Sequence, residues 1–239
     1  MQKNLIFALH GFLGQSKDWQ AVQTHMPKNI AWLAPNLFSK DSLDLASYYV
    51  YVDHLMTEYS AALKPFQRKI FVGYSLGGRL GLHLLKKYSN HFDQFVFVST
   101  HPGLQSPVEK SERKKSDRAW TDKIQNQTWS QFITEWNSQP VFSKNDPEPE
   151  RDETNFDRGK LALAMDLWSL AEQDDLRSLI HANNRKITWV VGDQDSKFLN
   201  LASDLEQKKI LLGFNKISSG HRILVSNSKD LAQLLQNWF

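Results

Sequence analysis

The sequence predicts an α/β fold in which a mostly parallel sheet is flanked by helices, and three observations support this prediction. Short apolar runs alternate along the chain with longer amphipathic segments, whose apolar residues recur every three or four positions. Several of the short runs end directly in loops that contain glycine. The chain has 239 residues, of which 41% are hydrophobic, so it is long enough to bury such a sheet.

Strands and helices are predicted to alternate over most of the chain. The predicted strands cover residues 5–9, 30–34, 70–72, 95–98, 187–191 and 209–212. The predicted helices cover residues 45–63, 80–88 and 229–238. This alternation is typical of βαβ units, in which consecutive strands run parallel.

The alternation is interrupted between residues 103 and 176, where the pattern indicates helices joined by loops. This stretch contains half of the chain's eight tryptophans, namely Trp120, Trp129, Trp136 and Trp168. We therefore expect one core domain, formed by residues 1–102 and 177–239, with residues 103–176 inserted as a helical cap or lid. An insertion of this length is usually functional, because long connections without structure are rare in compact domains.

Composition and charge exclude several classes of protein. No apolar stretch approaches the roughly 20 residues of a membrane-spanning helix, and no signal-peptide pattern opens the chain, so we expect a cytoplasmic monomer. Cysteine is absent, which excludes disulfides and cysteine-bound metals. No metal-ligand spacing, phosphate loop or dinucleotide motif is present, so no metal or cofactor is expected. The net charge of +3 does not suggest a nucleic-acid partner, but it suits a small anionic substrate.

The segment from Gly73 to Gly77 matches the Gly-x-Ser-x-Gly pattern of a nucleophile elbow. In such an elbow a sharp turn between a strand and a helix exposes the serine hydroxyl. Here a predicted strand precedes the motif and a predicted helix follows it. The N-terminus of that helix favours developing negative charge. We therefore predict Ser75 to be the catalytic nucleophile.

A serine nucleophile requires a base, and the base requires an acid that orients it. Two histidines follow the predicted cap. His181 is expected at a helix end, whereas His221 follows a glycine near the C-terminus, so we favour His221 as the base. The acid is Asp193 or Asp195, which share one loop, and their spacing does not distinguish them.

The predicted chemistry also requires two backbone N–H groups that form an oxyanion hole. One belongs to Leu76, which follows the nucleophile. The other is expected from Phe12, on the loop after the first predicted strand. His10 begins the same loop, and we interpret it as a structural histidine that hydrogen-bonds this loop.

Assembled in this order, these residues resemble the α/β-hydrolase superfamily. Within it, the chain is similar to the 2-succinyl-6-hydroxy-2,4-cyclohexadiene-1-carboxylate synthase family of menaquinone biosynthesis. The segments that carry this resemblance are residues 9–14, 18–19, 73–79, 116–120, 136–142, 192–198 and 220–221. The resemblance implies an α/β-hydrolase fold with reduced N-terminal edge strands, and it selects Asp195 over Asp193 as the acid.

The resemblance also implies a reaction other than hydrolysis. In that family the triad acts as a base that removes a substrate proton, and pyruvate is eliminated from a cyclohexene carrying several carboxylates. Arginines are then expected in the pocket, because a guanidinium group pairs with a carboxylate through two hydrogen bonds. Arg79 lies about one helical turn after Ser75, and Arg118 falls on the segment that matches a family arginine.

Further pocket residues follow from the same resemblance. Tyr74 and Trp136 are expected as pocket walls, and a third arginine is expected to be Arg151 or Arg158. The chain departs from the family at residues 35–39, where a Gly-His-Gly-like stretch is usual, and at position 137, where asparagine replaces a frequent tyrosine. These departures concern the substrate, not the hydrolase-type site.

The alternatives differ in the chemistry of the pocket. A carboxylesterase or thioesterase would use the same triad to form an acyl-enzyme in an apolar pocket, whereas the paired arginines favour the lyase. A non-catalytic receptor on this scaffold would tolerate loss of a triad residue, and none is lost. The alternative for Arg118 is a place in a solvated basic run that begins with Lys110, Arg113, Lys114 and Lys115.

Overall fold

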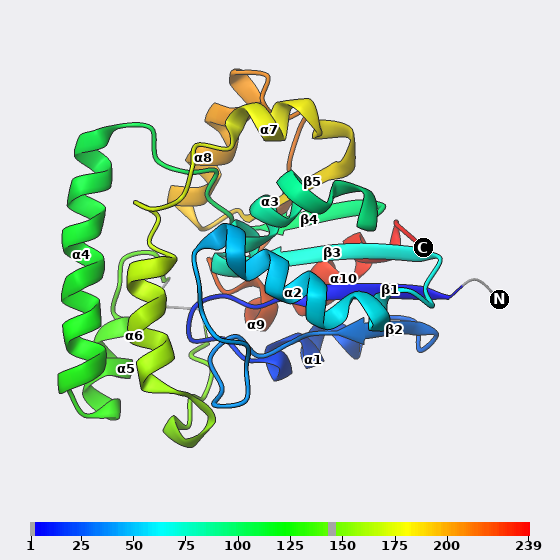
Figure 1. Cartoon of the computed structure of the whole chain (residues 1–239). Helices are drawn as coiled ribbons and strands as arrows, with labels where there is room; N and C mark the ends of the chain where they lie inside the picture. The colour runs from blue at the N-terminus through cyan, green and yellow to red at the C-terminus, as the bar shows by residue number, and fades with distance from the viewer. Residues whose placement is uncertain (1–2, 143–146) are drawn as a thin grey trace.

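The computed structural model describes residues 3–142 and 147–239, which form a six-stranded sheet with helices on both faces (Figure 1). In order across the sheet, the strands are β2 (Ile30–Leu33), β1 (Asn4–Leu9), β3 (Arg68–Tyr74), β4 (Gln94–Val98), β5 (Ile187–Gly192) and β6 (Asn215–Ile217). All neighbouring strands are parallel. The predicted α/β-hydrolase fold class is thus confirmed, with β1 inside the sheet and β2 at its edge.

The helices that surround the sheet belong to two parts of the chain. Those of the α/β part are α1 (Gln20–Gln23), α2 (Tyr48–Leu63), α3 (Leu76–Tyr88), α7 (Arg177–Ala182), α8 (Ser196–Gln207), α9 (Ile223–Ser226) and α10 (Ser228–Gln236). Those within residues 103–176 are α4 (Pro107–Asn126), α5 (Trp129–Asn137) and α6 (Arg158–Leu167). Across the described residues, no helix combines the length and the apolar character needed to cross a membrane.

Alternate residues of each strand pack against opposite layers of helices, because successive side chains of a strand point to opposite faces. In β1, Phe7 and Leu9 join the apolar core that includes α2, α3 and α8. Ile6 and Ala8 join the second core, which includes α1 and α10. All four side chains are fully buried. Burial on both faces explains why the strands appear in the sequence as continuous apolar runs.

The helices α4, α5 and α6 lie beside the carboxyl ends of the strands (Figure 1). The described part of residues 103–176 contains helices and no strand, as the sequence predicted. Their role as a cap over the site stays a prediction. Because parallel strands all end at one edge of the sheet, the loops that follow β1, β3, β4 and β5 meet beneath these helices.

One predicted strand is wrong in position. Residues 209–212 form a turn after α8, and the last strand, β6, begins at Asn215. The N–H groups of Ile210 and Leu211 donate to the carbonyl of Leu205 in α8, at 2.8 and 3.2 Å, so they are unavailable to the sheet. This packing buries Leu211, which accounts for an apolar residue in this turn. The ends of the other predicted strands and helices differ from the observed ones by at most four residues.

His83 in α3 is a fully buried histidine without a polar partner. Its ring stacks on Tyr48 with 4.4 Å between the ring centres. Neither ring nitrogen forms a hydrogen bond with a described residue. Burial lowers the pKa of His83 from its ordinary value of 6.5 to about 4. The folded protein therefore holds this ring neutral at pH values where the unfolded chain protonates it.

This difference predicts a loss of stability in acid. Between pH 6.5 and pH 4 the unfolded state binds a proton at His83 that the folded state does not, so stability falls as the pH falls. When the pH falls from 7 to 5, the unfolding free energy of the wild type should decrease. We expect the decrease in His83→Phe to be smaller by about 2 kcal/mol. Urea denaturation at both pH values measures this. The exposed His181→Phe variant should follow the wild type, and equal losses in His83→Phe and wild type would contradict the prediction.

Candidate active site

Ser75 occupies a strained turn between β3 and α3. Its φ of 52° and ψ of −109° belong to a region that L-residues rarely adopt. The neighbouring glycines make this turn possible. A Cβ atom on Gly73 would lie 2.6 Å from the Cα of Gly78, and one on Gly77 would clash with the carbonyl oxygen of Leu9. The turn has the geometry of a nucleophile elbow, which places the Ser75 hydroxyl above the sheet edge.

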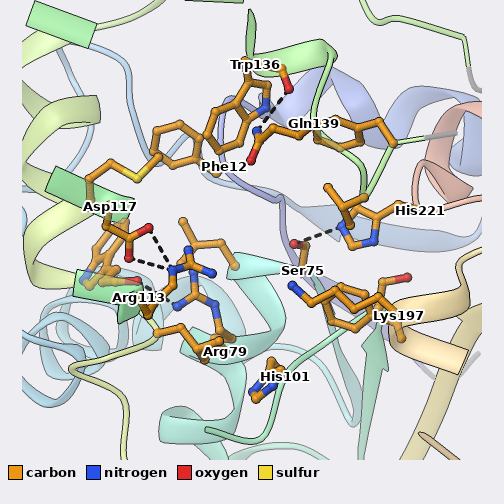
Figure 2. Close-up of a pocket in the computed structure, with 18 of the residues that line it drawn as sticks. Phe12, Ser75, Arg79, His101, Arg113, Asp117, Trp136, Gln139, Lys197 and His221 are labelled. Carbon is orange, nitrogen blue, oxygen red and sulfur yellow. Dashed lines mark hydrogen bonds and ion pairs between the residues drawn. The ribbon is translucent and has the colours of Figure 1, made fainter. Parts of the chain in front are cut away.

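His221 lies beside Ser75 (Figure 2). Asp195 holds the His221 ring from its other nitrogen. The Nε2 of His221 is 3.3 Å from Ser75 Oγ, and its Nδ1 is 2.6 Å from Oδ2 of Asp195. His221 and Asp195 are each 4% exposed. When Nδ1–H donates to the carboxylate, Nε2 is left as the acceptor that faces the hydroxyl. The structure therefore brings together the three residues that were predicted to act together.

The structure also distinguishes between the two aspartates that the sequence offered as the acid, and between the two histidines that it offered as the base. Asp195 contacts the His221 ring. Asp193 accepts a hydrogen bond from the backbone N–H of Ser219 at 3.1 Å, and thereby fixes the loop before His221. His181 is exposed at the end of α7, as predicted.

Two backbone N–H groups beside Ser75 are placed to receive negative charge. Leu76 is the first residue of α3, where an N–H group has no acceptor within its own helix. The N–H of Phe12 donates to no backbone acceptor among the described residues. Both residues line the same cavity as Ser75. This arrangement supports the oxyanion hole predicted from the sequence.

His10 fixes the loop that carries Phe12. Its Nε2 accepts a hydrogen bond from the N–H of Leu37 at 3.0 Å, and its Nδ1 lies 2.8 Å from the carbonyl oxygen of Gly11. Burial lowers the pKa of His10 to about 4, so the ring is neutral near pH 7. These contacts agree with a structural role.

A cavity of about 350 Å³ opens beside Ser75 (Figure 2). Part of its wall is aromatic, and Trp136 packs on Phe12 there with 4.7 Å between ring centres. Trp136 is thus one of the residues that line this cavity. The charged side chains among the described lining residues are Arg79, Arg113, Lys197 and Asp117. Three cations and one carboxylate leave a net excess of two positive charges.

Arg79 lines the cavity, where backbone and hydroxyl groups hold it in place. Its Nη1 donates to the hydroxyl of Tyr48 at 2.6 Å and to the carbonyl of Trp168 at 2.8 Å. Burial lowers the pKa of the guanidinium group, but an arginine side chain stays charged in proteins. Arg79 therefore carries a fixed positive charge one helical turn from Ser75.

The structure does not support the predicted place of Arg118 in this cavity. Arg118 is exposed on α4 and faces a separate hollow, whereas Arg113 on the same helix lines the cavity. The Nε of Arg113 is 2.8 Å from both carboxylate oxygens of Asp117, which also accepts a hydrogen bond from the hydroxyl of Ser169 at 2.7 Å. Sequence reasoning placed Arg113 in a solvated basic run and missed Asp117 and Lys197.

Three further predicted residues also lie away from the described lining of this cavity. The hydroxyl of Tyr74 donates to the carbonyl of His221 at 3.0 Å, and the ring faces a smaller neighbouring cavity. Arg151 lines that smaller cavity and donates to both carboxylate oxygens of Asp18, at 2.9 and 2.7 Å. Arg158 donates to backbone carbonyls at the end of α4 and fastens α6 to that helix. Neither candidate for the third arginine is therefore placed in the larger cavity.

Comparison with known proteins agrees with the fold and with the resemblance described above. The sequence profile of the alpha/beta hydrolase fold matches residues 4–226. Over 216 residues the chain is 29% identical to 2-succinyl-6-hydroxy-2,4-cyclohexadiene-1-carboxylate synthase from Citrobacter koseri, which covers 84% of this chain and 81% of that protein.

Two solved structures have the same fold at low sequence identity. MenH from S. aureus matches with a TM-score of 0.86 at 17% identity, over 100% of this chain and 94% of that chain. A thermophilic esterase from Thermogutta terrifontis matches with a TM-score of 0.74 at 17% identity, over 99% of this chain and 89% of that chain. The fold alone thus accommodates both MenH and an esterase.

Proposed function

Because the chain belongs to the α/β-hydrolase family and is an enzyme of that superfamily, we propose that Ser75, His221 and Asp195 form its catalytic triad. We further propose that it eliminates pyruvate to form 2-succinyl-6-hydroxy-2,4-cyclohexadiene-1-carboxylate, a step of menaquinone biosynthesis. The observation that carries this choice is the excess of cationic side chains in the cavity beside Ser75.

Arg79 and Arg113, called the arginine pair below, are suited to a substrate carboxylate. Arg79 uses only Nη1, and Arg113 only Nε, in their hydrogen bonds to described residues. Each guanidinium group therefore keeps N–H donors for a ligand, and such a fork pairs with a carboxylate through two hydrogen bonds. An esterase acyl pocket at this place would instead be apolar, because unpaired buried charge is unfavourable.

The triad supplies the proton transfer that an elimination requires. Ser75 Oγ, acting with His221 Nε2, removes a proton from the ring carbon beside the succinyl ketone. The N–H groups of Phe12 and Leu76 stabilise the negative charge on the ketone oxygen. The electron pair then forms a new ring double bond at the deprotonated carbon, the existing ring double bond shifts by one position, and the carbon–oxygen bond to the enolpyruvyl group breaks. The leaving enolate takes the proton from His221 and becomes pyruvate, so no further reactant is consumed.

A serine esterase is the second candidate, favoured by the aromatic part of the cavity wall. Trp136, Phe142 and Phe198 line the same cavity and would contact an apolar acyl group. In that reaction Ser75 would attack an ester carbonyl, and water would later release the acyl group.

Pyruvate release distinguishes the two reactions. Purified protein is incubated with the succinylated enolpyruvyl-cyclohexene carboxylate, and in parallel with p-nitrophenyl butyrate. We expect pyruvate to appear at a rate that Arg118→Gln does not change, since Arg118 lies outside the cavity. Hydrolysis of the ester without pyruvate release would contradict the lyase and support the esterase.

A further inference from the structure

We propose that Lys197, Ser99 and His101 form a second carboxylate subsite in this cavity, separate from the arginine pair. These three residues would hold one carboxylate of the substrate on the side of Ser75 opposite the arginine pair. This inference rests on the proposed function for the identity of the substrate, and it adds the residues that would hold one of its carboxylates.

Lys197 directs an ammonium group toward the candidate nucleophile. It follows Asp195 by two residues, in the first turn of α8, so the triad and the amine share one rigid support. Figure 2 shows the side chain entering the cavity near Ser75, on the side away from Arg113. Its Nζ lies 5.6 Å from the centre of the Phe198 ring. No hydrogen bond or ion pair joins this amine to the part of the chain that the structure describes.

Ser99 is a buried polar residue with a strained backbone conformation. It follows β4, is fully buried, and has a φ of 46°, in the left-handed region that serine rarely adopts. It lines the cavity, and its Oγ has no hydrogen-bond partner among the described residues. A buried hydroxyl without a partner is unfavourable, and backbone strain concentrates at ligand sites. A bound carboxylate would accept the hydrogen bond that Ser99 lacks.

His101 provides a neutral donor in the same part of the cavity. Its Nδ1 accepts a hydrogen bond from the N–H of Gly103 at 3.1 Å, so the neutral ring carries its proton on Nε2. Burial, followed by the positive charge of Lys197, lowers the pKa of His101 to about 3. The ring is therefore neutral near pH 7, and its Nε2–H is available as a donor.

The charge of the cavity favours two anionic groups over one. The described lining residues carry a net excess of two positive charges. Lys197 as a whole remains exposed. Desolvation of its amine beside the cavity, followed by the nearby charge of Arg113, lowers the pKa of Lys197, as expected for like charges that repel one another. One carboxylate at the arginine pair would leave the charge of Lys197 uncompensated. A second carboxylate at Lys197 would neutralise it.

Binding of simple acids tests the second subsite. Succinate, glutarate and adipate are compared with butyrate by isothermal titration calorimetry on the full chain, with and without Lys197→Met. For the dicarboxylate that binds most tightly, we expect Lys197→Met to weaken binding about tenfold, as for loss of one charged hydrogen bond. Butyrate, which occupies the arginine pair, should bind within about twofold of its wild-type affinity. Lys197→Arg should restore most of the loss, and Lys208→Met, at the far end of α8, should cause none.

Different results overturn the proposal. Equal weakening of butyrate and dicarboxylate would mean that Lys197 does not serve a second carboxylate. No weakening in either would remove Lys197 from anion binding. The variant Ser99→Ala, checked for folding by thermal denaturation, should weaken the dicarboxylate selectively, by about threefold. Because these are binding measurements, they stand even if pyruvate release fails, so failure of the lyase reaction and failure of the subsite are separate outcomes.

Discussion

Ser75→Ala is expected to lower kcat for pyruvate release by about a thousandfold or more, while the protein keeps its fold. The hydroxyl is the group that stands between His221 Nε2 and the cavity, at 3.3 Å from the ring. Alanine removes this group but meets the same backbone strain as serine, so stability should change little. Steady-state kinetics measure the rate, and urea denaturation measures the unfolding free energy.

A neighbouring serine provides the matched control for this experiment. Ser196 is exposed at the start of α8, directly after Asp195, and it lines neither described cavity beside the triad. Ser196→Ala should retain the wild-type rate. A Ser75→Ala protein that releases pyruvate within about tenfold of the wild-type rate would refute a role for Ser75 in the chemistry. This result would also remove the proposed triad, because His221 would then have no hydroxyl to activate.

The elbow was predictable because every residue that defines it is local in the sequence. The strand, the two glycines, the serine and the following helix are contiguous, and the backbone turn requires all of them. The partner residues are less local. His221 could be inferred from chain order, but Asp193 and Asp195 share one loop, and only its folded conformation shows which carboxylate meets the ring. The choice of Asp195 came from family resemblance.

The edge of the sheet shows where apolar patterning fails as a guide. In β6 only Ile217 is buried, and its two preceding residues are exposed, so this strand lacks an apolar run. Residues 209–212 have such a run because Ile210 and Leu211 pack beneath the end of α8. Leu212 in the same run is exposed, so the run marks neither a strand nor uniform burial, whereas strand pairing depends on which backbone groups remain free.

The expectation that Arg118 lines the cavity failed for a different physical reason, which is the direction in which each residue of a helix points. Five residues turn an α-helix by about 140°, so Arg113 and Arg118 cannot both face the cavity. A signal for the correct face was present. Arg113 begins a series with spacings of four, three and four residues that continues through Asp117, Trp120 and Ile124, and this spacing is typical of the inward face of a helix. Asp117 and Ile124 are indeed buried, whereas Arg118 is exposed.

Arg113→Lys is expected to raise KM for the anionic substrate about thirtyfold, with a smaller effect on kcat. Lysine keeps a positive charge near Asp117. The substitution therefore avoids an unpaired buried carboxylate, which would destabilise the fold by about 3–5 kcal/mol. It loses the planar fork, and a hydrogen bond between charged groups contributes about 2 kcal/mol, which corresponds to the expected change in KM. Steady-state kinetics of pyruvate release measure both constants.

Arg118→Lys is the matched control, since it makes the same substitution on the same helix but outside the cavity. Its KM should equal that of the wild type. If Arg118→Lys raised KM and Arg113→Lys did not, α4 would have to present its other face to the substrate, and the cationic cavity could no longer support the lyase. If both variants raised KM equally, general attraction of the anion by the positive charge of α4 would replace a carboxylate contact. An effect confined to Arg113 requires a carboxylate bound directly at the face that carries Asp117.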